Sequence, residues 1–492
     1  MDKRIKANMV MSLALQIVTI VSGFIIPKQI LLAFGSEVNG LVNSITQFLN
    51  YISLMEGGLG AVLMTALYKP LNEHDEKKIN GIIVAGNHFF KKIAKIFLVY
   101  LIIVSVVYPI IVKTQFSFEY VCSLSLILGI NLFVQYYFSI IWRLMLQADR
   151  KVFVSAGVQI IVIIINTILT IITIKIYPSV HFVKLISSLA FVLQPMIYNA
   201  YITKYYFINL KAIEDSSALK HRWDGFGINL AAFLNGNTDV MVLTLLSSLA
   251  NVSIYGVYSL VVLGIKSVIT AISAGITPSL GREYSLGHKQ NLKSIFLKYE
   301  NLIFFTTFSI YSCAIILIVP FVLNYTVGIN DTNYRQPVFS ILLIFSYGIF
   351  CLREPYVNMA YVSNAYKKIS KFAYIEAVIN VVLSFTFVHR YGLNGVALGT
   401  LCSMSFRTIV QVLYLWKNVL FRNPVIFILK FILFTLSSGS GIFLAQHFVT
   451  LSGEVSWGEW LLKAILSSTI IFLINILVGI LIIKWESKVK KA

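Results

Sequence analysis

Long apolar runs repeat along the whole chain, and they constrain the fold more than any other feature. Fourteen of them reach the length of about 20 residues that an α-helix needs to cross a bilayer. No polar stretch between them is long enough for a separate water-soluble domain. The sequence therefore predicts an all-α polytopic membrane protein with about 14 transmembrane helices. The predicted spans are residues 8–32, 39–68, 90–112, 119–142, 152–176, 181–203, 225–248, 251–280, 299–323, 337–362, 370–389, 393–416, 424–448 and 459–483.

The basic residues predict how these helices are oriented. Of the 40 Lys and Arg residues, 30 fall in or beside alternate polar segments, Lys430 among them, and four fall in the segments between. Because Lys and Arg gather on the cytoplasmic side of membrane proteins, both termini are expected to be cytoplasmic. The formal net charge of +20 is explained by this placement and requires no nucleic-acid partner. The four cysteines lie in apolar runs without the spacing of a metal site or a disulfide framework, and no cofactor is expected.

The longest polar interruption, residues 208–222, divides the first twelve spans six and six. Its charged residues are typical of a solvated linker. We therefore expect an N-terminal lobe over residues 1–207, a cytoplasmic linker over 208–222 and a C-terminal lobe over 223–420. Two further helices and a basic cytoplasmic tail occupy residues 421–492.

Polar residues recur on one face of several spans. In residues 39–60, NGLVNSITQFLNYISLMEGGLG, small and polar side chains follow one another at steps of three and four, which places them on one helix face. Such stripes also occur in the first, eighth, eleventh and twelfth spans. Unpaired polar groups are costly in hydrocarbon, so the stripes face protein or water. They predict a polar cavity between the two lobes, although a single stripe can equally join its helix to a neighbour.

Charged and amide side chains inside the spans are the candidate functional residues. The cations that could attract an anionic substrate are Lys266, Arg407, Arg353 and Lys28. For Lys266 and Arg407 the alternative is an internal ion pair. For Lys28 the alternative is that its side chain snorkels to the outer membrane surface. The further cavity-lining or ion-coupling candidates are Asn50, Glu56, Asn235, Asp239, Glu354, Glu376 and Gln411. The carboxylates could carry protons, bind a cation or serve as fixed partners of cations.

Four segments resemble a known transporter family. Asp239–Leu243 (DVMVL), Val252–Leu260 (VSIYGVYSL) and Ile276–Ser285 (ITPSLGREYS) resemble the seventh and eighth helices of polysaccharide-repeat flippases, of the O-antigen, capsule or teichoic type. Ser44–Gly60 (SITQFLNYISLMEGGLG) resembles their second helix. These flippases belong to the multidrug/oligosaccharidyl-lipid/polysaccharide exporter superfamily. The resemblance implies two six-helix lobes around a central cavity, with two additional C-terminal helices.

The resemblance also implies a function. Its members flip an undecaprenyl-diphosphate-linked oligosaccharide across the bacterial plasma membrane by alternating access, for capsule, exopolysaccharide or cell-wall polysaccharide assembly. The implied partners are this lipid-linked substrate, membrane lipids and the polymerase and glycosyltransferases of the pathway, and transport could be coupled to H⁺, Na⁺ or the membrane potential. The alternatives are a peptidoglycan-precursor flippase or a drug/cation antiporter of the same fold. A membrane polysaccharide polymerase is a further alternative, but the short outer loops and the lack of catalytic motifs argue against an enzyme.

Overall fold

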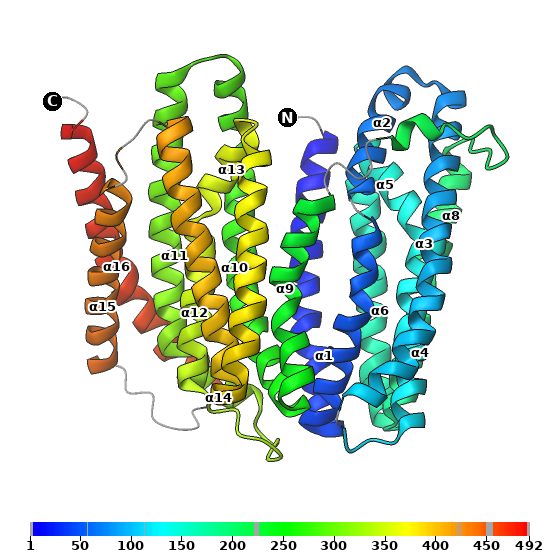
Figure 1. The fold of residues 1–492 in the computed structure, drawn as a ribbon, viewed down its shortest axis with the longest axis horizontal. Helices are drawn as coiled ribbons and strands as arrows, with labels where there is room; N and C mark the ends of the chain where they lie inside the picture. The colour runs from blue at the N-terminus through cyan, green and yellow to red at the C-terminus, as the bar shows by residue number, and fades with distance from the viewer. Residues whose placement is uncertain are drawn as a thin grey trace. The chain divides into compact units, whose positions relative to one another are not determined.

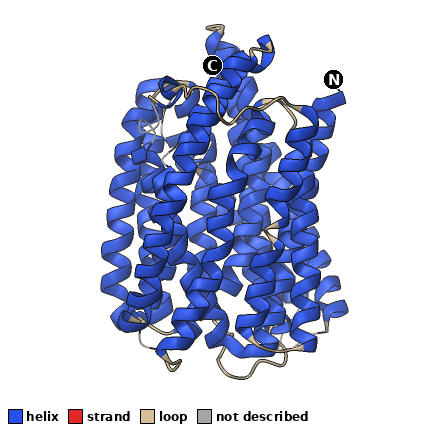
Figure 2. Ribbon diagram, turned by 90° about the vertical axis from the view of Figure 1, so that its right-hand side faces the viewer, coloured by secondary structure: helices blue, strands red, loops and turns tan. Residues whose placement is uncertain are grey.

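The computed structural model describes residues 3–56, 58–112, 114–220, 226–420, 423, 425–448 and 456–489. Within these ranges the regular structure is helical and contains no strand (Figures 1 and 2). Contacts divide the chain into two units. Unit 1 comprises Met1–Phe233 and Ser248–Ser253, and unit 2 comprises Leu234–Ser247 and Ile254–Ala492. His221 and Arg222, at the end of the predicted linker, lie outside the described residues.

Unit 1 is built mainly from the first eight α-helices. They are α1 (Lys3–Asn50), α2 (Leu59–Glu73), α3 (Glu76–Ile111), α4 (Phe118–Val134), α5 (Ile140–Ala148), α6 (Val152–Ile176), α7 (Val180–Ala190) and α8 (Leu193–Tyr205). Short helical turns complete the unit: the 3₁₀ segments η1 (Tyr51–Glu56) and η3 (Ser216–Leu219), and the π-helical turn η2 (Gln135–Ser139). Gly35 adopts φ 82° and ψ 178°, so α1 is two helices joined at a break.

Unit 2 contains most of the remaining helices. α9 (Phe226–Leu246) and α10 (Leu249–Ser285) begin in unit 1 and continue into unit 2. The others are α11 (Lys289–Tyr325), α12 (Pro337–Leu352), α13 (Glu354–Val362), α14 (Tyr366–Leu415), the π-helical turn η4 (Trp416–Leu420), α15 (Val425–Phe448) and α16 (Trp457–Val489). α14 is also two helices, because Gly392 has φ 52° and ψ −127°.

Eleven helical stretches of the described residues are long and apolar enough to cross a membrane. Two of them, 51 and 53 residues long, contain the breaks at Gly35 and Gly392, so each supplies two crossing segments. The fourteen predicted spans coincide with helical structure over most of their described residues. The prediction of an all-α, multi-pass membrane protein is therefore confirmed. The predicted domain boundaries and the cavity between lobes stay predictions.

The helices of each unit bury one apolar face and expose another. On α3, for example, Phe97 and Leu101 are buried, whereas Val99, Ile102 and Ile110 are 60%, 59% and 70% exposed. Apolar side chains on both faces are typical of a helix that contacts protein on one side and lipid on the other. Buried polar groups are correspondingly informative, because hydrocarbon offers them no partner.

The predicted span over residues 39–68 is not one continuous helix. α1 ends at Asn50, residues Tyr51–Glu56 form a 3₁₀ segment, and Gly58 has φ 111° before α2 begins at Leu59. A positive φ of this size favours glycine, which lacks a Cβ. The polar stripe therefore does not extend along a single helix face. Asn39, its first member, is 2% exposed and donates to Ser253 Oγ at 2.8 Å, so it joins α1 to the start of α10 within unit 1.

Candidate functional site

A buried ionic cluster in unit 2 surrounds Glu376 of α14. The Arg353 guanidinium donates from Nη1 to Glu376 Oε1 at 2.9 Å, and Arg407 donates from Nη1 to Oε2 at 2.5 Å. Asn235 Nδ2 of α9 donates to the same Oε2 at 2.7 Å. Arg353 and Glu376 are each 1% exposed. One carboxylate therefore serves two guanidinium groups and an amide within membrane-spanning helices.

The break in α14 brings Glu376 and Arg407 together. The two residues are 31 positions apart on the same helix, but the chain reverses at Gly392. The two halves then pack closely, because a Cβ on Gly395 would lie 2.3 Å from Phe387 O, and one on Gly399 would lie 2.7 Å from Ser384 N. Glycines four residues apart allow such close helix packing in membranes. The hairpin of α14 thus positions the carboxylate and one of its cations.

Cations outnumber carboxylates around Glu376. Both arginines keep a buried Nε without a hydrogen-bond partner among the described residues. Glu354, next to Arg353, is partly buried and forms no ion pair with the described residues. Lys266 of α10 also pairs with no carboxylate of the described chain, and its Nζ lies 4.0 Å from the centroid of the Phe350 ring. Glu354, Arg353 and Glu376 are charged neighbours of Lys266 without direct contact to it. The three cations face two carboxylates here, which leaves a surplus positive charge.

Asp239 of α9 has a different environment. It is 2% exposed and accepts hydrogen bonds from neutral hydroxyl groups: Thr400 Oγ1 at 2.8 Å to both carboxylate oxygens, and Tyr255 OH at 2.9 Å. Asn380 Nδ2 donates to Thr400 Oγ1 at 3.1 Å. No cation of the described residues pairs with Asp239. Gln411, also on α14, is fully buried, and both polar atoms of its amide lack a partner among the described residues.

The other three candidates belong to unit 1. Glu56 lies in η1, and its charged neighbour is Arg143 of α5. Gly60 packs against Glu56, since a Cβ there would lie 3.3 Å from Glu56 Oε1. Lys28 precedes the break in α1 and Asn50 ends that helix; both are partly buried. Of the candidates from the sequence, the structure thus joins Asn235, Arg353, Glu376 and Arg407 by direct contacts.

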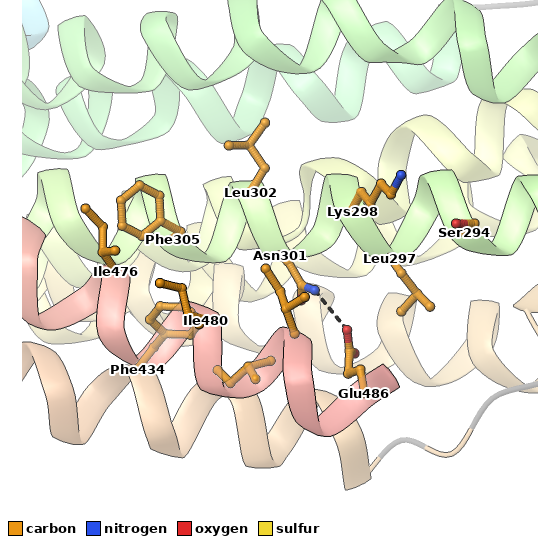
Figure 3. A pocket seen from close by; sticks show the side chains of 13 residues that line it. Ser294, Leu297, Lys298, Asn301, Leu302, Phe305, Phe434, Ile476, Ile480 and Glu486 are labelled. Carbon is orange, nitrogen blue, oxygen red and sulfur yellow. Dashed lines mark hydrogen bonds between the residues drawn. The ribbon is translucent and has the colours of Figure 1, made fainter. Parts of the chain in front are cut away.

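A second buried ionic cluster escaped prediction from the sequence. Lys430 of α15 contacts Glu300 of α11 at 2.6 Å and Glu486 of α16 at 2.8 Å. Tyr356 donates to Glu300, and Asn301 donates to Glu486 at 2.8 Å (Figure 3). Lys430 was expected among the cytoplasmic cations, which is wrong, because α15 begins at Val425 and Lys430 is 1% exposed.

The signal for Lys430 was its place in the apolar run VIFILKFILF, but its partners come from two distant helices. Arg143 was not among the candidates from the sequence either, and the structure places it inside α5, near Glu56. Beside the Lys430 cluster, α11, α15 and α16 border a largely apolar cavity of about 640 Å³ (Figure 3). Phe305, Phe434 and Ile480 line it.

This fold is similar to that of solved membrane transporters, among them a lipid II flippase and a MATE family multidrug resistance transporter of the MOP superfamily. The chain is similar to the lipid II flippase MurJ in its inward closed conformation, with a TM-score of 0.74 and 17% identity over 95% of this chain and 97% of that one. An inward-facing MATE family multidrug resistance transporter of the MOP superfamily gives a TM-score of 0.59 and 17% identity over 82% and 96% of the two chains. The Vibrio cholerae MATE transporter VcmN in its bent form gives 0.57 and 13% over 84% and 96%. No protein-family model and no curated protein matches the sequence.

Proposed function

We propose that the protein is a transporter that flips an undecaprenyl-diphosphate-linked oligosaccharide across the bacterial plasma membrane by alternating access. The observation that carries the proposal is the surplus positive charge around Glu376. A buried cation without a partner is costly, so an excess of cations within spanning helices is a functional feature by default. The fold shared with a lipid flippase and with exporters supports a transport role.

A diphosphate suits this cluster chemically. Phosphate oxygens accept two parallel hydrogen bonds from a guanidinium, and an ammonium acts on them as a point charge. Arg407 is 15% exposed through its side chain, so it is more accessible than Arg353, at 2%. Within the described chain Lys266 has no carboxylate partner to release before it meets an anion. In the proposed mechanism Lys266 and Arg407 attract the diphosphate, while Arg353 and Asn235 hold Glu376 in place.

Asp239 is the proposed site of ion coupling. An ionised carboxylate buried among neutral hydroxyl groups is less favourable than one in water, so uptake of a proton or a small cation would stabilise it. Its partner Thr400 lies on α14, which also carries Glu376 and Arg407. Uptake and release at Asp239 can therefore influence the same hairpin that positions the substrate cations.

A peptidoglycan-precursor flippase is the second candidate. The observation that favours it is the likeness to the lipid II flippase MurJ over 95% of this chain. The substrates of both candidates are glycans linked to a lipid diphosphate, and the positive charge of the cluster suits either substrate. A drug/cation antiporter is disfavoured, because a surplus positive charge repels a cationic drug.

The test is flipping by the purified protein in liposomes. Fluorescent undecaprenyl-diphosphate oligosaccharide, fluorescent lipid II and a cationic dye are each loaded, and a membrane-impermeant quencher reports the leaflet or compartment that holds the label. We expect the diphosphate oligosaccharide to flip faster than in protein-free liposomes, with lipid II slower. Faster flipping of lipid II would select the second candidate. Transport of the dye without movement of either lipid would refute the proposal.

A further inference from the structure

A separate cavity of about 940 Å³ opens at one end of unit 2 and shares no lining residue with the Glu376 cluster. It lies where three parts of the chain meet: the connection from α10 to α11, the turn from α13 to α14, and η4 at the end of α14. Figure 1 shows the α10–α11 connection at the same end of unit 2 as the C-terminal end of α16. The distribution of Lys and Arg predicts that this end faces the cytoplasm.

The lining of this cavity is basic. Lys289 and Lys293 project from the first two turns of α11, and Lys368 from the first turn of α14. None of the three forms an ion pair with the described residues. Glu283 is the carboxylate among the lining residues, and its Oε2 already lies 3.1 Å from Nδ1 of His288. Three lysines therefore surround the opening with one acid, which has another partner.

The backbone adds to this positive charge. α11 and α14 both begin at the cavity, and their N-cap residues, His288 and Ala365, supply no capping side-chain hydrogen bond. The N–H groups of Lys289 and Lys368 already donate to the backbone carbonyls of Gly287 and Ala365. The remaining first-turn N–H groups of an uncapped helix can bind an oxygen acceptor, and the helix dipole favours an anion there. The lysines and these N–H groups together offer several donors to one multivalent anion.

Apolar groups line another part of the cavity. Leu292, Val419 and Leu420 belong to it, beside the ring of Tyr414. On α14, Ile409 and Leu413 are 59% and 47% exposed, which indicates that this helix borders lipid close to the cavity. A basic rim combined with apolar lining, at the end of membrane-spanning helices, is typical of a site for an anionic lipid headgroup.

We propose that this cavity binds the phosphate-bearing headgroup of an anionic phospholipid from the cytoplasmic leaflet. The phosphate contacts Lys289, Lys293 and Lys368, and the acyl chains leave along the apolar lining toward the bilayer. A membrane lipid is favoured over a soluble phosphate compound because the cavity combines basic side chains with an apolar lining at the membrane boundary. The site is independent of the proposed transport substrate.

The test counts lipids bound to the purified full-length protein by native mass spectrometry. Detergent-solubilised protein is titrated with phosphatidylglycerol and, separately, with phosphatidylcholine. We expect one saturable phosphatidylglycerol site on the wild type. The triple variant Lys289→Gln, Lys293→Gln and Lys368→Gln should bind it about a hundredfold more weakly, since each lysine near a membrane surface contributes about a fivefold factor and the three factors multiply. The matched control is Lys77→Gln, Lys92→Gln and Lys95→Gln, three exposed lysines of α3 in unit 1.

Three outcomes would overturn the proposal. Equal losses of phosphatidylglycerol binding in the triple variant and the control would mean that diffuse surface charge attracts the lipid and that the cavity is not a specific site. Displacement of phosphatidylglycerol by inorganic phosphate at similar concentration would assign the cavity to a soluble anion. Displacement by undecaprenyl diphosphate, with phosphatidylglycerol itself binding no better than phosphatidylcholine, would assign it to the transport substrate. If the triple variant is poorly produced, Lys293→Gln alone must still weaken phosphatidylglycerol binding severalfold.

Discussion

Glu376 and Glu354 lie close to the same cations, yet only Glu376 of this pair contacts them directly within the described chain. Glu376 accepts hydrogen bonds from Arg353 and Arg407, whereas Glu354 has Arg353 and Lys266 as charged neighbours without direct contact. The difference decides what each acid does for stability. Removing one partner of a buried ion pair leaves an uncompensated charge, while removing an unpaired carboxylate does not.

The variant Glu376→Gln is therefore expected to be strongly destabilised. It leaves the buried guanidinium of Arg353 and the partly buried one of Arg407 without the carboxylate that they contact, at a cost of about 3–5 kcal/mol. The measurement is thermal unfolding of detergent-purified protein, together with its abundance in membranes. Glu354→Gln is the matched control and should unfold close to the wild type. If both variants unfold at the wild-type temperature, the ionic cluster does not hold the helices together.

The variant Asp239→Asn tests whether Asp239 is the site of ion coupling. Asparagine keeps the shape of the side chain and can still accept from Thr400 and Tyr255, but it neither ionises nor attracts a cation. We expect normal abundance, with flipping that no longer responds to an imposed H⁺ or Na⁺ gradient in liposomes. A variant that responds to the gradient as the wild type does would remove Asp239 from the coupling mechanism.

At the scale of elements, the hairpin of α14 is the part that the transport mechanism requires. Gly399→Ala would place a methyl group 2.6 Å from Ser384 Oγ and 2.7 Å from Ser384 N, so the two halves must separate. Overpacking of this kind costs about 1–3 kcal/mol. The expected result is a lower unfolding temperature together with slower flipping. Gly264→Ala in α10 is the control, since nothing lies within 4 Å of a Cβ there. An equal loss of stability and flipping in the control would show that close packing within the α14 hairpin does not explain the effect.

The helices themselves were predictable from the sequence. In a membrane, an α-helix satisfies all the backbone hydrogen bonds of an apolar run of spanning length within the run itself. The breaks were harder to predict. Residues 51–56 are as apolar as their neighbours, so hydrophobicity alone does not indicate that they form a 3₁₀ segment and not an α-helix.

The pairings were not predictable either. The polar spacing within the spans identified Arg407, Glu376 and Asn235 as candidates. It did not show that both arginines would pair with Glu376. Lys430, Glu300 and Glu486 come from three helices, and no periodicity along one helix can reveal such a triad. Sequence patterns indicate which residues are polar within a span, while their partners depend on helix packing.

For the whole molecule, the distribution of charge predicts both termini in the cytoplasm. Ser217, in the long polar interruption, should then lie inside, and Thr332, between α11 and α12, outside. Single cysteines at these two positions, in a variant that lacks the four native cysteines, can be labelled in intact cells with a membrane-impermeant maleimide. We expect labelling at position 332 alone until the membrane is opened. Labelling of both positions in intact cells would refute the predicted topology.

The central claim is that cations in unit 2 capture a lipid diphosphate, and Lys266 tests it most directly because its loss breaks no ion pair of the described residues. The measurement is the affinity of purified protein for undecaprenyl diphosphate, with Lys184→Gln in α7 as a matched change in a spanning helix of unit 1. Lys266→Gln should weaken binding about ten- to a hundredfold, equivalent to about 1.5–3 kcal/mol, and Lys266→Arg should keep part of it. The unfolding temperature should stay that of the wild type. Wild-type affinity in a folded Lys266→Gln variant would contradict the account.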